Sequence, residues 1–84
     1  MIDYRYQTFL VLADSLDYAM VEEDLCLSKQ AITQHIHYLE TDLEVKLFQN
    51  QGGNLVLTKK GQLLKNRLVI INEHIDDLLH QLAN

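Results

Sequence analysis

The feature that most constrains the fold is a regular apolar stripe near the end of the chain. Its members are separated by steps of four, three, four, three and four residues: Leu64, Leu68, Ile71, Ile75, Leu78 and Leu82. A repeat of about 3.5 residues is typical of the seam between two packed helices. We therefore predict a helix from about residue 59 to residue 83, with Thr58 as its N-cap.

A helix of this length presents more apolar surface than a small domain covers. At about 1.5 Å per residue it is roughly 37 Å long, and its apolar face is widened by Leu63, Val69, Ile70 and Leu79. The stripe fits either a helix folded back onto its own core or an arm that pairs with a second subunit. Because soluble monomers rarely expose large apolar patches, we predict a dimer formed through the six stripe residues.

Three shorter helices are indicated before this one. The first covers about residues 3–14, with apolar positions at Tyr6, Phe9, Leu10, Leu12 and Ala13. Asp17 is a suitable N-cap for a second helix over about residues 18–25, whose side from Ala19 to Leu25 we expect to face inward. Ser28 is a suitable N-cap for the third helix.

The third helix has a buried stripe of its own, made of Ile32, Ile36, Leu39 and Leu43. Only residues 26–28 separate it from the second helix, a connection short enough for a helix-turn-helix corner. Downstream, residues 46–48 and 55–57 flank residues 49–54 with the adjacent glycines Gly52 and Gly53, which predicts a small β-hairpin. With no proline and three glycines, the chain is predicted to be mainly α-helical.

The charge distribution along the chain is uneven. The formal net charge is -5, and residues 1–27 hold six acids against one arginine. However, no carboxylate lies between Asp24 and Glu40, and residues 28–62 hold four lysines against three acids. The middle of the chain is therefore the part that would least repel an anionic partner such as nucleic acid.

The acid-free stretch would present polar side chains on the outer face of the third helix. With the apolar stripe buried, the residues turned outward are Lys29, Gln30, Thr33, Gln34 and His37. Glutamine can pair with adenine through two hydrogen bonds, a threonine methyl group can contact thymine, and lysine can reach a guanine or a phosphate. The stretch fits a helix that reads base edges in a major groove, and it also fits a charge-poor solvated face.

Motifs spread along the chain favour the first of these interpretations. They are Phe9 and Ala13 in the first helix, the segment LSKQAITQHIHYLETDLEVKLF from Leu27 to Phe48, and the segment LTKKG from Leu57 to Gly61. In this order they resemble the N-terminal winged helix-turn-helix domain of LysR-type transcriptional regulators. The positions that fit the family pattern in register are Ser28, Ala31, Ile32, Thr33, Ile36, Leu39, Glu40, Leu43, Leu47, Phe48, Leu57, Thr58 and Gly61.

The resemblance implies a bacterial DNA-binding domain over residues 1–58 and a linker helix over residues 59–84 that pairs two subunits. The third helix would enter the major groove, and the hairpin wing would reach the neighbouring minor groove or backbone. Carried over by position, the DNA-binding residues are Ser28, Lys29, Gln30, Thr33, Gln34, His37, Gln51, Gly53, Asn54, Lys59 and Lys60. The implied function is sequence-specific binding of double-stranded DNA by a homodimer, for the regulation of transcription. Glutamine and threonine side chains lead us to expect an A·T-rich inverted repeat.

Three positions depart from the family pattern in a way that bears on affinity. Family arginines are replaced by Gln34, Asn50 and Gly53, which removes guanidinium contacts that supply salt-dependent affinity for DNA. The remaining cations are lysines, with His35 and His37 expected to add charge on the DNA surface at lower pH. An alternative function is therefore a LysR-like dimeric protein-interaction module with weak or lost DNA binding.

No other chemistry is indicated by the sequence. His35 and His37 point in nearly opposite directions on a helix and cannot share a metal ion, and no nucleophile has a base beside it. We predict neither an enzyme nor a cofactor, metal site or small-molecule effector site. Cys26 has no cysteine to pair with, and we expect it to be a small packing residue. Without a leader or an apolar run of membrane-spanning length, the protein is expected in the bacterial cytoplasm, at the nucleoid when bound.

Overall fold

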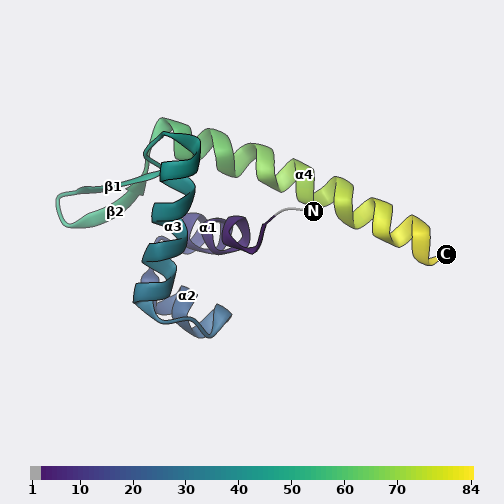
Figure 1. Cartoon of the computed structure of the whole chain (residues 1–84), viewed down its shortest axis with the longest axis horizontal. Helices are drawn as coiled ribbons and strands as arrows, with labels where there is room; N and C mark the ends of the chain where they lie inside the picture. Colours follow the sequence, from purple (N-terminus) through teal and green to yellow (C-terminus); the bar gives the residue numbers. More distant parts are fainter. Residues whose placement is uncertain (1–2) are drawn as a thin grey trace.

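The computed structural model describes residues 3–84, and that part of the chain has four helices and one β-hairpin (Figure 1). Helices α1 (Tyr4–Ser15), α2 (Tyr18–Leu25) and α3 (Lys29–Leu43) pack together as a small bundle. Strands β1 (Phe48–Gln51) and β2 (Asn54–Leu57) follow, and α4 (Lys59–Ala83) comes last. This arrangement confirms the predicted mainly α-helical, winged helix-turn-helix fold with a long C-terminal helix.

A side-chain N-cap begins each of the four helices, with Asp3 capping α1. The side chains of Asp17, Ser28 and Thr58 accept hydrogen bonds from backbone amides two or three residues further on, with 2.9 to 3.1 Å between nitrogen and oxygen. Each bond satisfies an amide that has no partner inside its helix. These are the N-caps predicted for α2, α3 and α4, and all three are confirmed.

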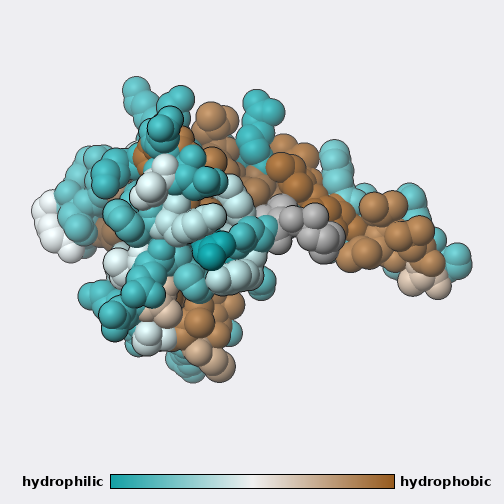
Figure 2. Space-filling view, in the orientation of Figure 1, coloured by the Kyte–Doolittle hydropathy of each residue, from teal (hydrophilic) through white to brown (hydrophobic). Residues whose placement is uncertain are grey.

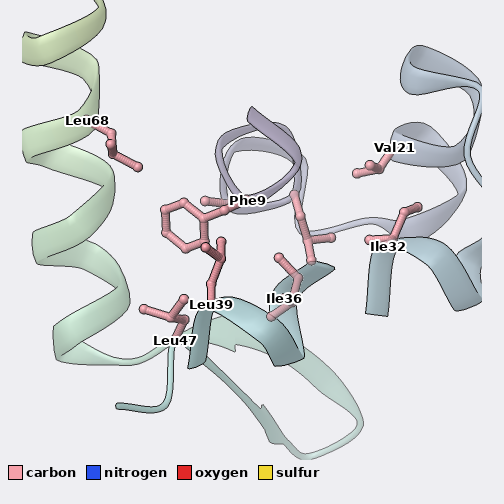
Figure 3. Close-up of a cluster of buried hydrophobic side chains, with 9 residues drawn as sticks. Phe9, Val21, Ile32, Ile36, Leu39, Leu47 and Leu68 are labelled. Carbon is pink, nitrogen blue, oxygen red and sulfur yellow. The ribbon is translucent and has the colours of Figure 1, made fainter. Parts of the chain in front are cut away.

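The core lies where α1 crosses α3 and is closed by α2, the hairpin and the start of α4. Its buried apolar side chains are Phe9, Leu12, Ala13, Val21, Ile32, Ile36, Leu39, Leu47 and Leu68. Figure 3 shows Phe9 at the centre of this cluster, with Leu39, Leu47 and Leu68 toward the hairpin and α4. The Phe9 ring also packs at an angle against that of Phe48, with 5.5 Å between ring centroids.

Some predicted core positions are corrected by the structure. In α2 the buried residue is Val21, whereas Ala19 is exposed, because this two-turn helix meets the bundle along a narrow line. Leu43 is exposed, since α3 ends there and the chain turns away at Glu44. Cys26 is exposed as well, at the C-cap of α2, so it is not the packing residue that we expected.

The hairpin is more regular than the sequence indicated. The strands pair antiparallel from Phe48 opposite Leu57 to Gln51 opposite Asn54, so the connection has two residues rather than six. Gly52 and Gly53 have φ angles of 57° and 84°. Positive φ at both central residues is the requirement of the tight hairpin turn that matches strand twist. The glycine pair therefore lets the paired strands continue up to the two-residue turn.

The hairpin is joined to the bundle by a half-buried carboxylate and a close backbone approach. The Glu40 carboxylate accepts hydrogen bonds from the amides of Leu47, at 2.7 Å, and Phe48, at 3.4 Å. On the other side, a Cβ atom at Gly61 would lie 2.2 Å from the Leu47 carbonyl oxygen, so only glycine lets α4 approach the hairpin this closely. The wing is thereby held against the end of α3 and the start of α4.

Among residues 3–84, α4 is buried against the core near its beginning, and its middle borders α1 across a hollow lined by Leu10 and Ile75. Leu68 is 5% exposed, whereas Ile71, Leu78 and Leu82 are 44%, 54% and 73% exposed. Figure 1 shows the rest of α4 extending away from the bundle, and Figure 2 shows hydrophobic residues along this arm. The described residues span 49 × 27 × 20 Å. No helix among them is long and apolar enough to cross a membrane.

Candidate nucleic-acid interface

The outer face of α3 is polar, exposed and free of acids over its first two turns. Lys29, Gln30, Thr33, Gln34 and His37 are all exposed, as predicted from the spacing of the buried stripe. Figure 2 shows a continuous hydrophilic surface over this part of the bundle. The first carboxylate along α3 belongs to Glu40, whose charge is directed to the hairpin amides. The face can therefore meet an anion without a carboxylate at its centre.

Hydrogen bonds within α3 limit what two of these residues can offer. The Thr33 hydroxyl donates to the Lys29 carbonyl oxygen at 2.9 Å, which leaves the methyl group and an oxygen lone pair for a partner. The Ser28 oxygen accepts the Ala31 amide at 3.1 Å, which leaves its hydroxyl proton for an acceptor such as phosphate. Gln30 and Gln34 have no such bond in the described residues, and both keep complete amide groups.

The wing lies beside this face, and a crevice of about 190 Å³ separates the two. Thr33 and His37 border it from α3, and Phe48 and Asn50 border it from β1. The other predicted contact residues are also at the surface: Gln51, Gly53 and Asn54 at the exposed hairpin tip, and Lys59 and Lys60 in the first turn of α4. The outer face of α3 and the wing thus lie side by side, and α4 begins directly after the wing.

His35 lies on a different side of α3 and is a correction to the sequence-based prediction. Its Nδ1 atom is 2.9 Å from the hydroxyl oxygen of Thr8, which is buried in α1. The Tyr4 ring packs edge-on against the imidazole, with 5.2 Å between centroids. His35 therefore belongs to the α1–α3 contact, because residue 35 is two positions from His37 and points away from it.

Two further residues near the face were missed by the sequence reasoning. The ring of Tyr18, at the start of α2, lies 5.1 Å from the Lys29 ammonium nitrogen. The Arg5 guanidinium stacks on Tyr38 of α3 at 3.9 Å from the ring centroid and forms an ion pair with Asp3 at 2.8 Å. The contacts of Tyr18 with Lys29 and of Arg5 with Tyr38 join different helices, so residue spacing carried no signal for them.

One tyrosine at the α1–α3 contact has a shifted pKa. Burial raises the pKa of Tyr6 above its usual value of 10.0, and the negative charge of Asp42 adds to the effect. The phenol therefore stays neutral at physiological pH. Tyr6 packs against the core, away from the outer face of α3, and plays a structural part.

The comparison with protein families decides the identity of this fold. The sequence model of bacterial regulatory helix-turn-helix proteins of the lysR family matches residues 4–62, which include α1, α2, α3 and the hairpin. The chain belongs to the LysR family. Its members are regulators rather than enzymes, in agreement with the sequence-based prediction. The match also confirms the predicted resemblance over the segments quoted above.

Individual LysR-family proteins support the same conclusion. The HTH-type transcriptional regulator DsdC of Escherichia coli (strain K12) is 32% identical over 81 residues, which are 92% of this chain and 26% of DsdC. A LysR-family transcriptional regulator from Eggerthella lenta DSM 2243, solved by crystallography, is 38% identical with a TM-score of 0.77, covering 82% of this chain and 99% of that one. The chain spans between 20% and 26% of the length of the curated relatives it matches.

The BenM DNA-binding domain, in the crystal structure of its complex with catB site 1 DNA, has the same fold. Its TM-score is 0.88 at 14% identity, and the alignment covers 99% of this chain and 92% of that one. At this identity the likeness concerns the fold alone. It includes α4 as well as the winged bundle, because nearly all of this chain is aligned.

Proposed function

We propose that this chain binds a specific double-stranded DNA site as a homodimer and so regulates transcription. The observation that carries the proposal is the acid-free outer face of α3, with an exposed wing beside it and two lysines at the start of α4. In helix-turn-helix proteins the second helix lies in the major groove and its first turns contact base edges. Gln30, Thr33 and Gln34 are placed for that role here.

The same residues favour A·T pairs within the site. Glutamine side chains pair through two hydrogen bonds with adenine N6 and N7, and the free methyl group of Thr33 suits the thymine methyl group. Lys59, Lys60 and the hairpin tip are assigned to the phosphate backbone and the adjacent minor groove. We expect few ionic contacts per subunit and a moderate dependence of affinity on salt.

The dimer is proposed to form through the exposed part of the α4 stripe. Leu64 and Leu68 pack against the core of their own chain, so the surface left for a partner is centred on Ile71, Leu78 and Leu82. The charges of α4 support an antiparallel pairing. Its cations lie before Ile71 and its acids after it: Lys59, Lys60, Lys65 and Arg67, then Glu73, Asp76 and Asp77. In an antiparallel pair that crosses near Ile71, cations of each helix lie near acids of the other.

We therefore divide the chain into a winged domain over residues 1–58 and a dimerisation helix over residues 59–84. Two-fold pairing implies an inverted repeat, with half-sites about one helical turn apart or more. No small-molecule effector site is assigned to this chain. We place its activity in the bacterial cytoplasm, at the nucleoid when bound to DNA.

A selection from randomised duplexes at low salt tests the proposal. The parent protein should enrich an A·T-rich inverted repeat and bind it at least about 10³-fold more tightly than unrelated DNA, the lower end of the range for specific regulators. A variant with Gln30 and Gln34 both changed to Ala serves as the comparison. If the parent binds no duplex at low salt, the acidic net charge and the missing arginines point instead to a dimeric protein-interaction module.

A further inference from the structure

We propose that Tyr18 is a positioning residue that directs Lys29 to the phosphate backbone and away from the base edges. The inference rests on the proposed DNA binding. It assigns Lys29 to phosphate contact and leaves base reading to other residues of α3. The carrying contact joins two elements: the Lys29 ammonium nitrogen lies 5.1 Å from the centroid of the Tyr18 ring. That distance is within the range of a cation–π interaction, about 6 Å.

The placement of Lys29 on α3 supports this direction. Thr33 and Glu40 line the crevice between α3 and the wing, together with Tyr18. Lys29 precedes Thr33 by one helical turn and therefore starts from the same flank of the helix. Thr33 also borders the hollow on the outer face of α3, whereas Gln34 and Tyr38 border only that hollow. The lysine stem thus leaves α3 on the side that faces α2.

The position of Tyr18 indicates which part of the DNA the α2-facing side of α3 would contact. Tyr18 is the first residue of α2, held in place by the Asp17 cap and half-buried against the core. In a helix-turn-helix, the first helix crosses the DNA backbone while the second enters the groove. An ammonium group held over the Tyr18 ring therefore lies at the backbone side of the interface.

The chemistry of the two side chains fits such a role. Lysine is a compact point charge that suits a phosphate, and it lacks the planar donor pair with which arginine reads guanine. Its flexible stem loses conformational entropy when it is fixed on binding. The ring contact already restricts the stem in the free protein, so less entropy is lost when DNA binds. Among residues 3–84 the one ion pair joins Arg5 and Asp3, so no carboxylate competes there for the Lys29 ammonium.

A double-mutant cycle tests the inference with the parent protein, Tyr18→Leu, Lys29→Gln and the double variant. Affinity is measured as a function of salt on the selected duplex and on a duplex of the same composition in permuted order. Lys29→Gln should weaken both duplexes by the same factor and reduce the salt slope by about one per subunit. Tyr18→Leu should weaken both by about two- to fivefold, from the size of an exposed cation–π contact. In the Lys29→Gln background it should have no effect.

Tyr18→Phe is the matched control, because it keeps the ring and removes only the hydroxyl group. It should bind both duplexes within about twofold of the parent, as expected when the ring face makes the contact. Thermal unfolding of each variant separates lost binding from lost folding. If Tyr18→Leu does not fold, Tyr18→Phe and Lys29→Gln still provide the control and the salt-slope test.

Several outcomes overturn the inference while leaving DNA binding intact. One is that Lys29→Gln discriminates less than the parent at a single base pair, which would show that Lys29 reads a base. Another is an equal effect of Tyr18→Leu in the presence and absence of Lys29, which leaves the pair uncoupled. A parent protein that binds neither duplex refutes the proposed function itself, and that result is visible before any variant is measured.

Discussion

The Thr8 hydroxyl and the His35 imidazole are joined by a hydrogen bond of 2.9 Å that ties α1 to α3. This bond accounts for one of the two histidines that we expected on the DNA surface. His37, two residues further on, remains exposed and borders the crevice next to the wing. Of these two residues, only His37 is placed to meet a phosphate.

We predict that His37→Ala weakens DNA binding, because the exposed imidazole can donate a hydrogen bond to a phosphate. His35→Ala should leave the affinity nearly unchanged and lower the unfolding temperature, because it removes the bond to Thr8. Binding curves and thermal unfolding of both variants measure the two effects. The reverse result for the two variants would show that His35 leaves Thr8 in the complex.

Gln34→Ala should weaken binding to the best site by about 1–3 kcal/mol and relax discrimination at one base pair. Gln34 is exposed on the outer face of α3, and its amide makes no hydrogen bond in the described residues. A panel of duplexes with single base-pair changes measures both effects. Gln62→Ala, an exposed glutamine outside the proposed contact surface, is the control. Equal discrimination by parent and Gln34→Ala protein would exclude this side chain from base reading.

Lys60→Ala should weaken all duplexes by the same factor and reduce the salt slope by about one per subunit, because a phosphate contact carries no sequence information. Lys60 is exposed in the first turn of α4, near the hairpin. Lys65→Ala removes the same charge further along α4 and should leave the slope nearly unchanged. Titrations at four or more salt concentrations separate the two variants.

Ile71→Asp combined with Leu78→Asp should prevent formation of the proposed dimer and give monomers. Both side chains are about half exposed in the single chain and lie in the apolar stripe of α4. Burying two carboxylates in the seam without partners costs several kcal/mol. Asn66→Asp, which adds a charge on the opposite side of α4, is the control. Sedimentation of the parent as a monomer at high micromolar concentration would refute this dimer.

Gly61→Ala should lower the free energy of unfolding by about 1–3 kcal/mol, the usual cost of overpacking. The added methyl group would lie 2.2 Å from the Leu47 carbonyl oxygen and 2.9 Å from Leu57 Cδ2, so α4 and the hairpin must separate. Denaturant titration measures the change. Gln62→Ala, the exposed neighbour, should stay within about 0.5 kcal/mol of the parent.

The fold was largely predictable because its signals are local in sequence. Caps at Asp17, Ser28 and Thr58 and stripes at helical spacing determine where the helices begin and which sides they bury. The exposure of the polar residues on α3 followed from the same periodicity. The role of that face on DNA stays a prediction, because the structure contains the protein alone.

The parts that could not be predicted depend on packing between elements. His35 was placed on the DNA side although its spacing from His37 turns it away from the outer face, and its partner Thr8, 27 residues away, could not be identified from the sequence. The contact of Tyr18 with Lys29 is of the same kind. Leu68 was assigned to a dimer seam, but it lies in the chain's own core, because one periodic stripe can serve an intramolecular contact at one end and a free surface at the other.

The link from Glu40 to the amides of Leu47 and Phe48 has a consequence for the DNA. A single carboxylate near the end of α3 holds the base of the wing, so α3 and the base of the wing keep a constant separation. In the proposed complex, the protein would then adjust little to duplexes whose grooves differ in width. The DNA would bend or narrow to reach both elements, and the energy of that deformation depends on base sequence. Base pairs that no side chain touches would then contribute to site selection.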